Sequence, residues 1–430
     1  MPMCNRFLIG LLLLVPSVAL AAAAAAQLDF EKTPINYSQA TPTDRVYAFG
    51  QQLSSGQAEL TWDSDHGYLR SILQQLDIPV SSQSLVFSKT SLQVSRISPR
   101  TPRAVYFNDD VYVGWVQYGD VIELSAADAS LGGTFYALSQ KRVAAPAIRR
   151  ETSHCLQCHG STHTRRTPGH IVRSVTSEKT GLPVYRLGTH LTDHKSAFSE
   201  RFGGWYVTGT HGDQRHMGNV WLSDPNESEE LDTDAGANVT DLSSRLDIAP
   251  YLSPHSDIVA LMVLQHQVHM HNVLTAANHS GRLTARDAVV MNSALERGED
   301  FESDSTRRRY DSAAEKVLKA LLFCDEHLLT EKVTGTSSFR AEFEARGPFE
   351  NAGRGLRQFD LKRRLFRYPC SYLIYSEAFQ GLPERVRQRV LQRLQEVLSG
   401  ADLTEPFADL TPVDRQAISQ ILAATYRTAD

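Results

Sequence analysis

Residues 155–159 constrain this chain more than any other segment, because they read Cys-Leu-Gln-Cys-His. Two cysteines separated by two residues lie along one edge of a helical turn, and such thiols add to the two vinyl groups of a haem. The histidine that follows reaches the iron from one face of the macrocycle. The pattern predicts one covalent heme c with its iron per chain, attached through Cys155 and Cys158, with His159 as the proximal ligand.

Three other uses of the cysteine pair compete with haem attachment. A redox dithiol is expected in a βαβ context, which the flanking sequence does not suggest. A zinc site needs a second pair of ligands at suitable spacing, and the sequence offers none. A disulfide across so short a loop is strained and stabilises little. The adjacent histidine therefore favours haem.

The N-terminus predicts export. Residues 7–15 are apolar and residues 21–26 are small, which is typical of a secretory signal peptide cleaved after Ala26. A retained anchor is the alternative, since 7–26 is just long enough to span a bilayer, but Pro16 and Ser17 oppose it. No later segment is long and apolar enough to span. We therefore expect a mature protein in the periplasm or at the cell surface, without a transmembrane segment.

The remaining cysteines leave one question open. Five are encoded, and Cys4 belongs to the predicted signal peptide. Outside the attachment motif, only Cys324 and Cys370 remain, in a compartment that permits disulfides. They form either a disulfide or two buried free thiols, and the sequence does not separate these alternatives.

Charge and composition exclude several classes of protein. The chain has 44 Lys and Arg against 49 Asp and Glu, a net charge of −5, so no basic excess points to nucleic acid. Hydrophobic residues make up 41%, which is ordinary for a globular protein. A length of 430 residues predicts two or three domains.

Periodicity predicts an α+β chain in four parts after the leader. Residues 27–145 indicate an antiparallel sheet with one helix, and residues 146–225 indicate a loop-rich haem c module. Residues 226–240 are acidic and suggest a linker, and residues 241–430 are helical. The expected strands are 84–87, 104–107, 111–116, 121–124 and 134–138, with a second hairpin formed by 173–175 and 184–187. The expected helices are 67–76, 257–279, 310–329, 384–398 and 411–426.

The sixth position of the iron has several candidate ligands. The first is Met217, the only methionine between the motif and the long helix, flanked by Gly212 and Gly218 that let the backbone bend. His211 and His216 lie in the same stretch. The long helix offers a face that mixes histidine and methionine: Met262, His266, His269, Met270 and Val273. The remaining candidates are His170, His190 and His194. Each of these residues also has an ordinary packing role open to it.

Three arginines follow the attachment motif closely. Arg165, Arg166 and Arg173 either pair with the anionic propionates of the haem or are solvated. The run Ser303–Tyr310 carries three further arginines and is interpreted as a solvated charged segment.

The chain is similar to a family of exported, planctomycete-type bacterial proteins with a single-haem cytochrome c domain. Six segments carry the resemblance, and they extend over nearly all of the mature chain: 85–93, 106–116, 155–160, 200–219, 261–272 and 364–379. The resemblance implies haem binding and electron transfer, and it implies no substrate. Small c-type cytochromes are mostly helical around the haem, whereas the residues after Gly160 are punctuated by glycine and proline, so a small-carrier fold is not expected.

The combined expectation is an exported monohaem c-type cytochrome that transfers single electrons to an unknown redox partner protein. The alternative is a haem-dependent oxidoreductase, peroxidase-like or other, with an open distal iron site, because about 400 residues exceed what a carrier needs. A third interpretation makes residues 241–430 a module that docks a partner.

Overall fold

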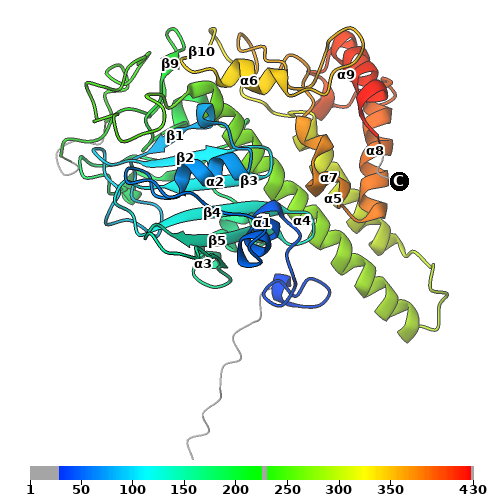
Figure 1. The fold of residues 1–430 in the computed structure, drawn as a ribbon. Helices are drawn as coiled ribbons and strands as arrows, with labels where there is room; N and C mark the ends of the chain where they lie inside the picture. The colour runs from blue at the N-terminus through cyan, green and yellow to red at the C-terminus, as the bar shows by residue number, and fades with distance from the viewer. Residues whose placement is uncertain (1–28, 225–229, 428–430) are drawn as a thin grey trace, which may run out of the picture.

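The computed structural model describes residues 29–224 and 230–427 (Figure 1). An antiparallel sheet occupies the N-terminal half of the chain and helices occupy most of the C-terminal half, which confirms the α+β prediction. The predicted signal peptide, including Cys4, lies outside the described residues.

The main sheet has six strands in sequential order, and each pairs antiparallel with its neighbours. Asn108 closes the hairpin between the second and third strands, because its Oδ1 accepts hydrogen bonds from the backbone N–H groups of Asp110 and Val111. The hairpin agrees with the expected strands 104–107 and 111–116. The strands are β1 (Ser84–Val86), β2 (Arg103–Phe107), β3 (Val111–Trp115), β4 (Val121–Asp128), β5 (Gly132–Ser139) and β6 (Ile148–Arg150).

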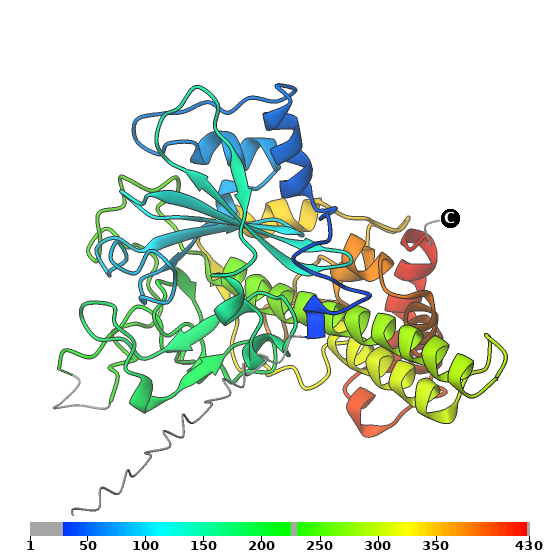
Figure 2. The same cartoon turned by 90° about the horizontal axis from the view of Figure 1, so that it is seen from below.

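Each face of the sheet is covered by a different part of the chain. Alternate side chains such as Tyr106, Val113 and Leu124 pack with α1 (Arg45–Ser54) and α2 (Leu69–Gln75). The opposite face, which includes Tyr112 and Phe107, joins the core built by the C-terminal helices. Figure 2 shows α1 and α2 on one side of the sheet and the long helix on the other.

The long helix, α4 (Ile258–Ala294), has 37 residues and extends 15 residues beyond the predicted end at His279. Asp257 caps its N-terminus by accepting from the N–H groups of Val259 and Ala260. The predicted helix ended just before Gly281, since glycine lowers helix propensity. A Cβ at Gly281 would lie 2.9 Å from Pro383 and Val386, so the glycine permits close packing of another helix.

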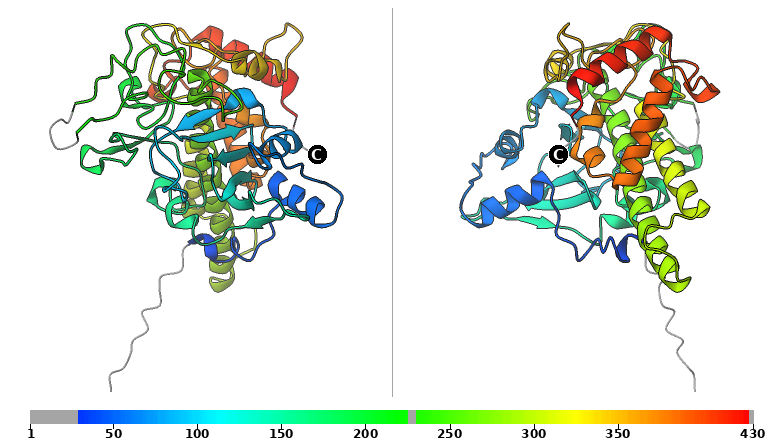
Figure 3. Two further views of the ribbon diagram at one scale, coloured as in Figure 1. Left: turned by 60° about the vertical axis from the view of Figure 1, so that its left-hand side comes forward. Right: turned by 90° about the vertical axis from the view of Figure 1, so that its right-hand side faces the viewer.

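Most of the other C-terminal helices pack against α4, and the last one packs against the helix that precedes it (Figure 3). One of them, expected at 310–329, starts earlier, because the Ser303 hydroxyl caps the N–H of Thr306, and it ends before Phe323 with its left-handed φ of 54°. The helices are α5 (Asp304–Leu321), α6 (Phe339–Ala345), α7 (Glu377–Gln380), α8 (Glu384–Leu398) and α9 (Pro412–Thr425). The bounds of α8 and α9 agree closely with the predicted helices 384–398 and 411–426.

The second hairpin differs from the prediction in its second strand. β7 (Arg173–Val175) pairs with β8 (Thr189–Leu191), whereas the predicted partner was 184–187. Residues 185–187 form a 3-10 turn instead, and Gly188, with φ of 91°, turns the chain into β8. A further short pair joins β9 (Gly209–Thr210) to β10 (Thr334–Gly335).

Within the described residues, no helix is both long enough and apolar enough to span a bilayer.

Candidate functional site

The attachment motif lies on the single helical turn α3 (Leu156–His159). The carbonyl oxygen of Cys155 accepts a hydrogen bond from the backbone N–H of His159 at 2.9 Å, which closes the turn. Both cysteines are free thiols, with Cys155 half-buried and Cys158 exposed. The structure thus brings the three predicted attachment residues together on one turn.

The His159 imidazole is held by one hydrogen bond. Its Nδ1 lies 2.8 Å from the carbonyl oxygen of Gly169. A carbonyl only accepts, so Nδ1 must carry the proton, and the lone pair is then on Nε2. Nε2 has no hydrogen-bond partner in the part of the chain that the structure describes. Burial lowers the pKa of His159, which favours the neutral ring that ligates metals.

The loop that supplies this carbonyl is fixed between the sheet and α4. The N–H of Gly169 donates to the carbonyl of His159 at 2.8 Å, so the loop returns onto the motif. On the helix side, Asn272 makes two bonds to the backbone of His170: Oδ1 accepts at 2.9 Å and Nδ2 donates at 2.8 Å. The position of the Gly169 carbonyl, and hence the orientation of His159, therefore depends on α4.

Aromatic rings surround the buried side of His159. Phe135 of β5 lies 4.7 Å from the imidazole, between ring centroids, and 5.8 Å from the ring of His170. His170 in turn lies 4.5 Å from Tyr112, whose hydroxyl bonds to Nδ1 of His271 at 2.8 Å. The contact with Phe135 shields one side of the His159 imidazole from water.

An ion pair lies on the neighbouring part of the sheet. Arg103 and Glu123 are 2.6 Å apart, and the Arg103 guanidinium lies over β3, where a Cβ at Gly114 would be 2.3 Å from it. The charges of this pair shift the pKa values of both the His159 imidazole and the Cys155 thiol: Arg103 lowers each pKa and Glu123 raises it. Sequence inspection missed the pair, because its members come from two strands 20 residues apart.

Two of the three competing uses of the motif, the redox dithiol and the zinc site, can be compared with the surroundings of the two thiols. Burial, with nearby Glu151 and Glu123, raises the pKa of Cys155 to about 11, whereas redox-active cysteines have lowered values. For zinc, the one group of three or more clustered potential ligands among the described residues is Asp63, Asp65 and His66, which are far from the motif in sequence and form a turn. The raised pKa of Cys155 therefore differs from that of a redox dithiol, and neither cysteine belongs to a cluster of three or more potential metal ligands among the described residues.

Met217, the first candidate for the sixth ligand, lies against β7. Its sulfur accepts a hydrogen bond from the Ser174 hydroxyl at 3.7 Å, and its backbone N–H donates to the carbonyl of Arg201. The side chain is half-buried. Binding an iron held by His159 would require Met217 to give up the contact with Ser174, so its role as ligand stays a prediction.

The two histidines of the same loop form a buried pair. The rings of His211 and His216 are 4.7 Å apart and pack on Phe198. Nδ1 of His216 accepts from the N–H of Gly218, and Nε2 of His211 accepts from the N–H of Asn238. Each histidine thus has one nitrogen engaged in holding the loop.

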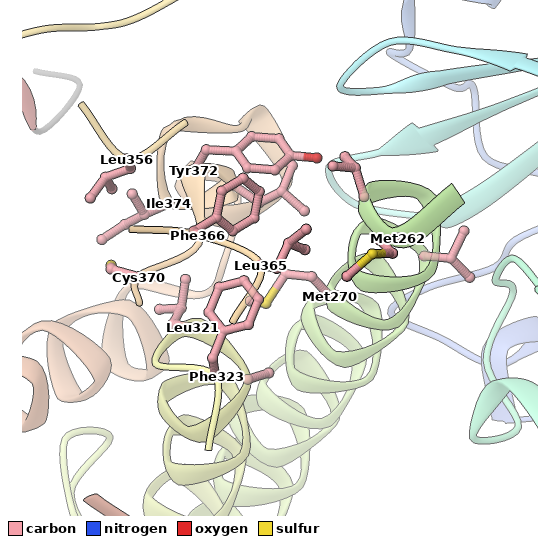
Figure 4. Packing of buried hydrophobic residues seen from close by; sticks show 14 of the residues in the cluster. Met262, Met270, Leu321, Phe323, Leu356, Leu365, Phe366, Cys370, Tyr372 and Ile374 are labelled. Carbon is pink, nitrogen blue, oxygen red and sulfur yellow. The ribbon is translucent and has the colours of Figure 1, made fainter. Parts of the chain in front are cut away.

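The second candidate face, on α4, is largely part of the hydrophobic core. Met262 and Met270 are buried among aromatic side chains that include Phe323 (Figure 4). His266 stacks on Phe323 at 4.0 Å and bonds to Ser371, while His269 pairs with Asp193 at 2.9 Å. Asn272, which bonds to the backbone of His170, lies on a different side of the helix. The side chains of this face thus have packing and hydrogen-bonding partners within the protein.

The remaining candidates are dispersed. His194 lies 3.3 Å from His266 between Nδ1 atoms, and His190 lies 3.8 Å from Glu200. His170 is the one closest in sequence to the bond that holds His159, but its side chain is 6% exposed and faces the core. Arg165 and Arg166 are exposed. The positive charge of Arg173 contributes to lowering the pKa of His159.

Cys324 and Cys370 are separate buried thiols. Burial raises the pKa of each to about 12, so both stay protonated and inert at neutral pH. The structure favours the free-thiol alternative over the disulfide.

The support of His159 was not found from sequence. Pro168-Gly169 marks only a turn in the sequence, and Asn272 is one polar residue in a histidine-rich helix. Comparisons with protein-family models, with curated proteins and with solved structures found no match, so the interpretation of the site depends on its own chemistry.

Proposed function

We propose that this chain is an exported monohaem c-type cytochrome whose role is one-electron transfer. The observation that carries the proposal is the fixed tautomer of His159, with Nδ1–H bonded to the Gly169 carbonyl and Nε2 free, on the same turn as two free thiols. A ligating histidine commonly donates its other ring N–H to a carbonyl in this way.

The residues present fit a covalently held haem. Cys155 and Cys158 would hold it, and Nε2 of His159 would face its iron. A bound haem supplies a one-electron couple. The chain contributes the rest: the Gly169 carbonyl orients the imidazole, Phe135 keeps water from its inner side, and Arg103 offers a cation beside the site.

Haem staining after denaturing electrophoresis tests the proposal. The chain is expressed in a host with cytochrome c maturation machinery, and the expected result is a stained band with the mass of one added haem. Cys158→Ser should remove most of the stain, whereas Cys370→Ser, at a buried thiol outside the motif, should keep it. A wild-type chain of unmodified mass from a competent host would refute covalent attachment.

A haem-dependent oxidoreductase is the second candidate, and the position of Met217 favours it. The sulfur of this expected sixth ligand is already engaged by Ser174. If no side chain completes the coordination, the iron is open to small molecules. Carbon monoxide separates the two functions: a carrier with six ligands reacts little when reduced, and an open site reacts readily.

A further inference from the structure

A groove with a cationic rim lies between α4 and α5. It has a volume of about 430 Å³, and its floor is apolar, formed by Val273, Ala276, Ala277 and Ala313. The rim contains Arg165, Arg308, Arg309 and Lys316, and Arg165 comes from the loop that follows the attachment motif. On α5, residues 305, 308, 312 and 316 share one side, so the rim extends for about 16 Å.

Three of the rim cations have no acidic partner within the described ranges. Arg309 pairs with Asp287 at 2.9 Å, and the neighbouring Arg307 pairs with Glu302 and Asp304. Arg165, Arg308 and Lys316 take part in none of the ion pairs that the structure shows between residues 29–224 and 230–427. In a chain of net charge −5, an unneutralised cationic rim around an apolar floor is suited to an anionic partner.

The segment that connects α4 to α5 is complementary to the groove, because it exposes apolar side chains and carboxylates. Phe301 is 46% exposed, and Met291 and Leu295 beside it in sequence are 54% and 48% exposed. Two carboxylates, Glu299 and Asp300, precede the phenylalanine, are exposed, and take part in none of the ion pairs within the described ranges. We call residues 295–301 the tip.

We infer that a second copy of this chain occupies the groove, with Phe301 of each copy on the apolar floor of the other. The carboxylates of the tip then meet the unpaired cations of the rim. Because tip and groove belong to the same pair of helices (Figure 2), one two-fold axis lets both contacts form at once. A buried aromatic anchor inside a charged rim is the arrangement typical of strong protein interfaces.

The oligomeric state measured by light scattering tests this inference. Wild-type chain should have twice the chain mass at about 100 μM protein and about 0.15 M salt, and high salt should weaken the dimer. Phe301→Asp should raise the dissociation constant at least tenfold. Arg70→Glu, an exposed arginine on α2 across the sheet, is the matched control and should leave the dimer intact.

Charge exchange makes the test specific. The groove variant Arg308→Glu with Lys316→Glu should be monomeric, and so should the tip variant Glu299→Lys with Asp300→Lys, because in each the two contacts repel. An equimolar mixture should form heterodimers, since both contacts are attractive again. Circular dichroism checks that each variant is folded.

Two outcomes would overturn the inference. One is a wild-type chain that stays monomeric at this concentration, which would leave the groove for another anionic partner. The other is a dimer that persists in Phe301→Asp and in both charge variants. Neither result depends on haem, so both are distinguishable from failure of the proposed function.

Discussion

The carbonyl that holds His159 belongs to Gly169, and a methyl group at this position should destabilise the protein. A Cβ there would lie 2.3 Å from Oδ1 of Asn272, whereas an ordinary contact is at least 3.4 Å. Asn272 cannot rotate away without losing its two bonds to His170. The backbone must therefore move by about 1 Å, at a cost of about 1–3 kcal/mol for overpacking and about 1 kcal/mol for each weakened hydrogen bond.

We expect Gly169→Ala to lower the free energy of unfolding by about 2–4 kcal/mol, measured by chemical denaturation at neutral pH. Gly50→Ala in α1 is the matched control, because the atom nearest to the added carbon is Cβ of Ile148 at an ordinary 3.6 Å, and it should be neutral or slightly stabilising. Equal stabilities of these two variants would refute the close packing of the loop on α4.

A double-mutant cycle tests the cause of the loss. Asn272→Ala alone leaves the N–H and carbonyl of His170 without these partners and should also destabilise. The combined variant removes the atom that the new methyl group strikes, so its cost should be smaller than the sum of the two single costs. Strictly additive costs would show that Asn272 is not what the methyl group meets.

Further predictions concern the iron, acid stability and a helix end. If Met217 is the sixth ligand, Met217→Ala should lower the reduction potential and make the reduced protein bind carbon monoxide; an unchanged spectrum would exclude it. Burial lowers the pKa of His194 to about 3 and of His271 and His279 to about 4, so each takes up a proton only on unfolding. Stability should therefore fall as pH decreases from about 6.5 towards 4, by up to about 4 kcal/mol per pH unit for the three together; a flat unfolding curve there would contradict their burial. Thr411→Ala removes the capping box of α9 and should cost about 1 kcal/mol, whereas an unchanged melting temperature would show that the cap adds nothing.

The sequence predicted the regular elements well where the pattern was local. Five strands, the hairpin at Asn108 and the helix Glu384–Leu398 followed from alternation, turn chemistry and one apolar helical face. The expected start of the last helix at residue 411 was likewise local, because the Thr411 side chain caps a backbone N–H group in its own first turn. These features need few distant contacts.

The sequence-based predictions differed from the structure where tertiary contacts determine how far an element extends. Gly281 lowers helix propensity, but in the fold it makes room for α8, so the helix continues. For the histidine–methionine face of α4, the sequence left a haem pocket and a core role open, and the structure shows that Met262 and Met270 pack in the core. Periodicity indicates that a face is buried, but it does not indicate against what.

The candidate site shows the same division. The motif at Cys155, Cys158 and His159 was evident from spacing alone, since the three residues lie on one turn. Gly169 and Asn272, which fix the histidine, are 10 and 113 residues away in sequence and carry no pattern of their own. Only the fold brings them to the site.

The bond between Asn272 and the backbone of His170 joins residues 102 positions apart, and this separation orders the steps by which an exported chain folds. Under the proposed function, the motif crosses the membrane well before the helix that fixes its loop. Until α4 docks, the two thiols lie on a segment without this anchor, which leaves them accessible to an attachment enzyme. Once α4 docks, the loop is held from the side of the core. Attachment of the proposed haem would then precede closure of the loop, and the time available for it would depend on the distance along the chain.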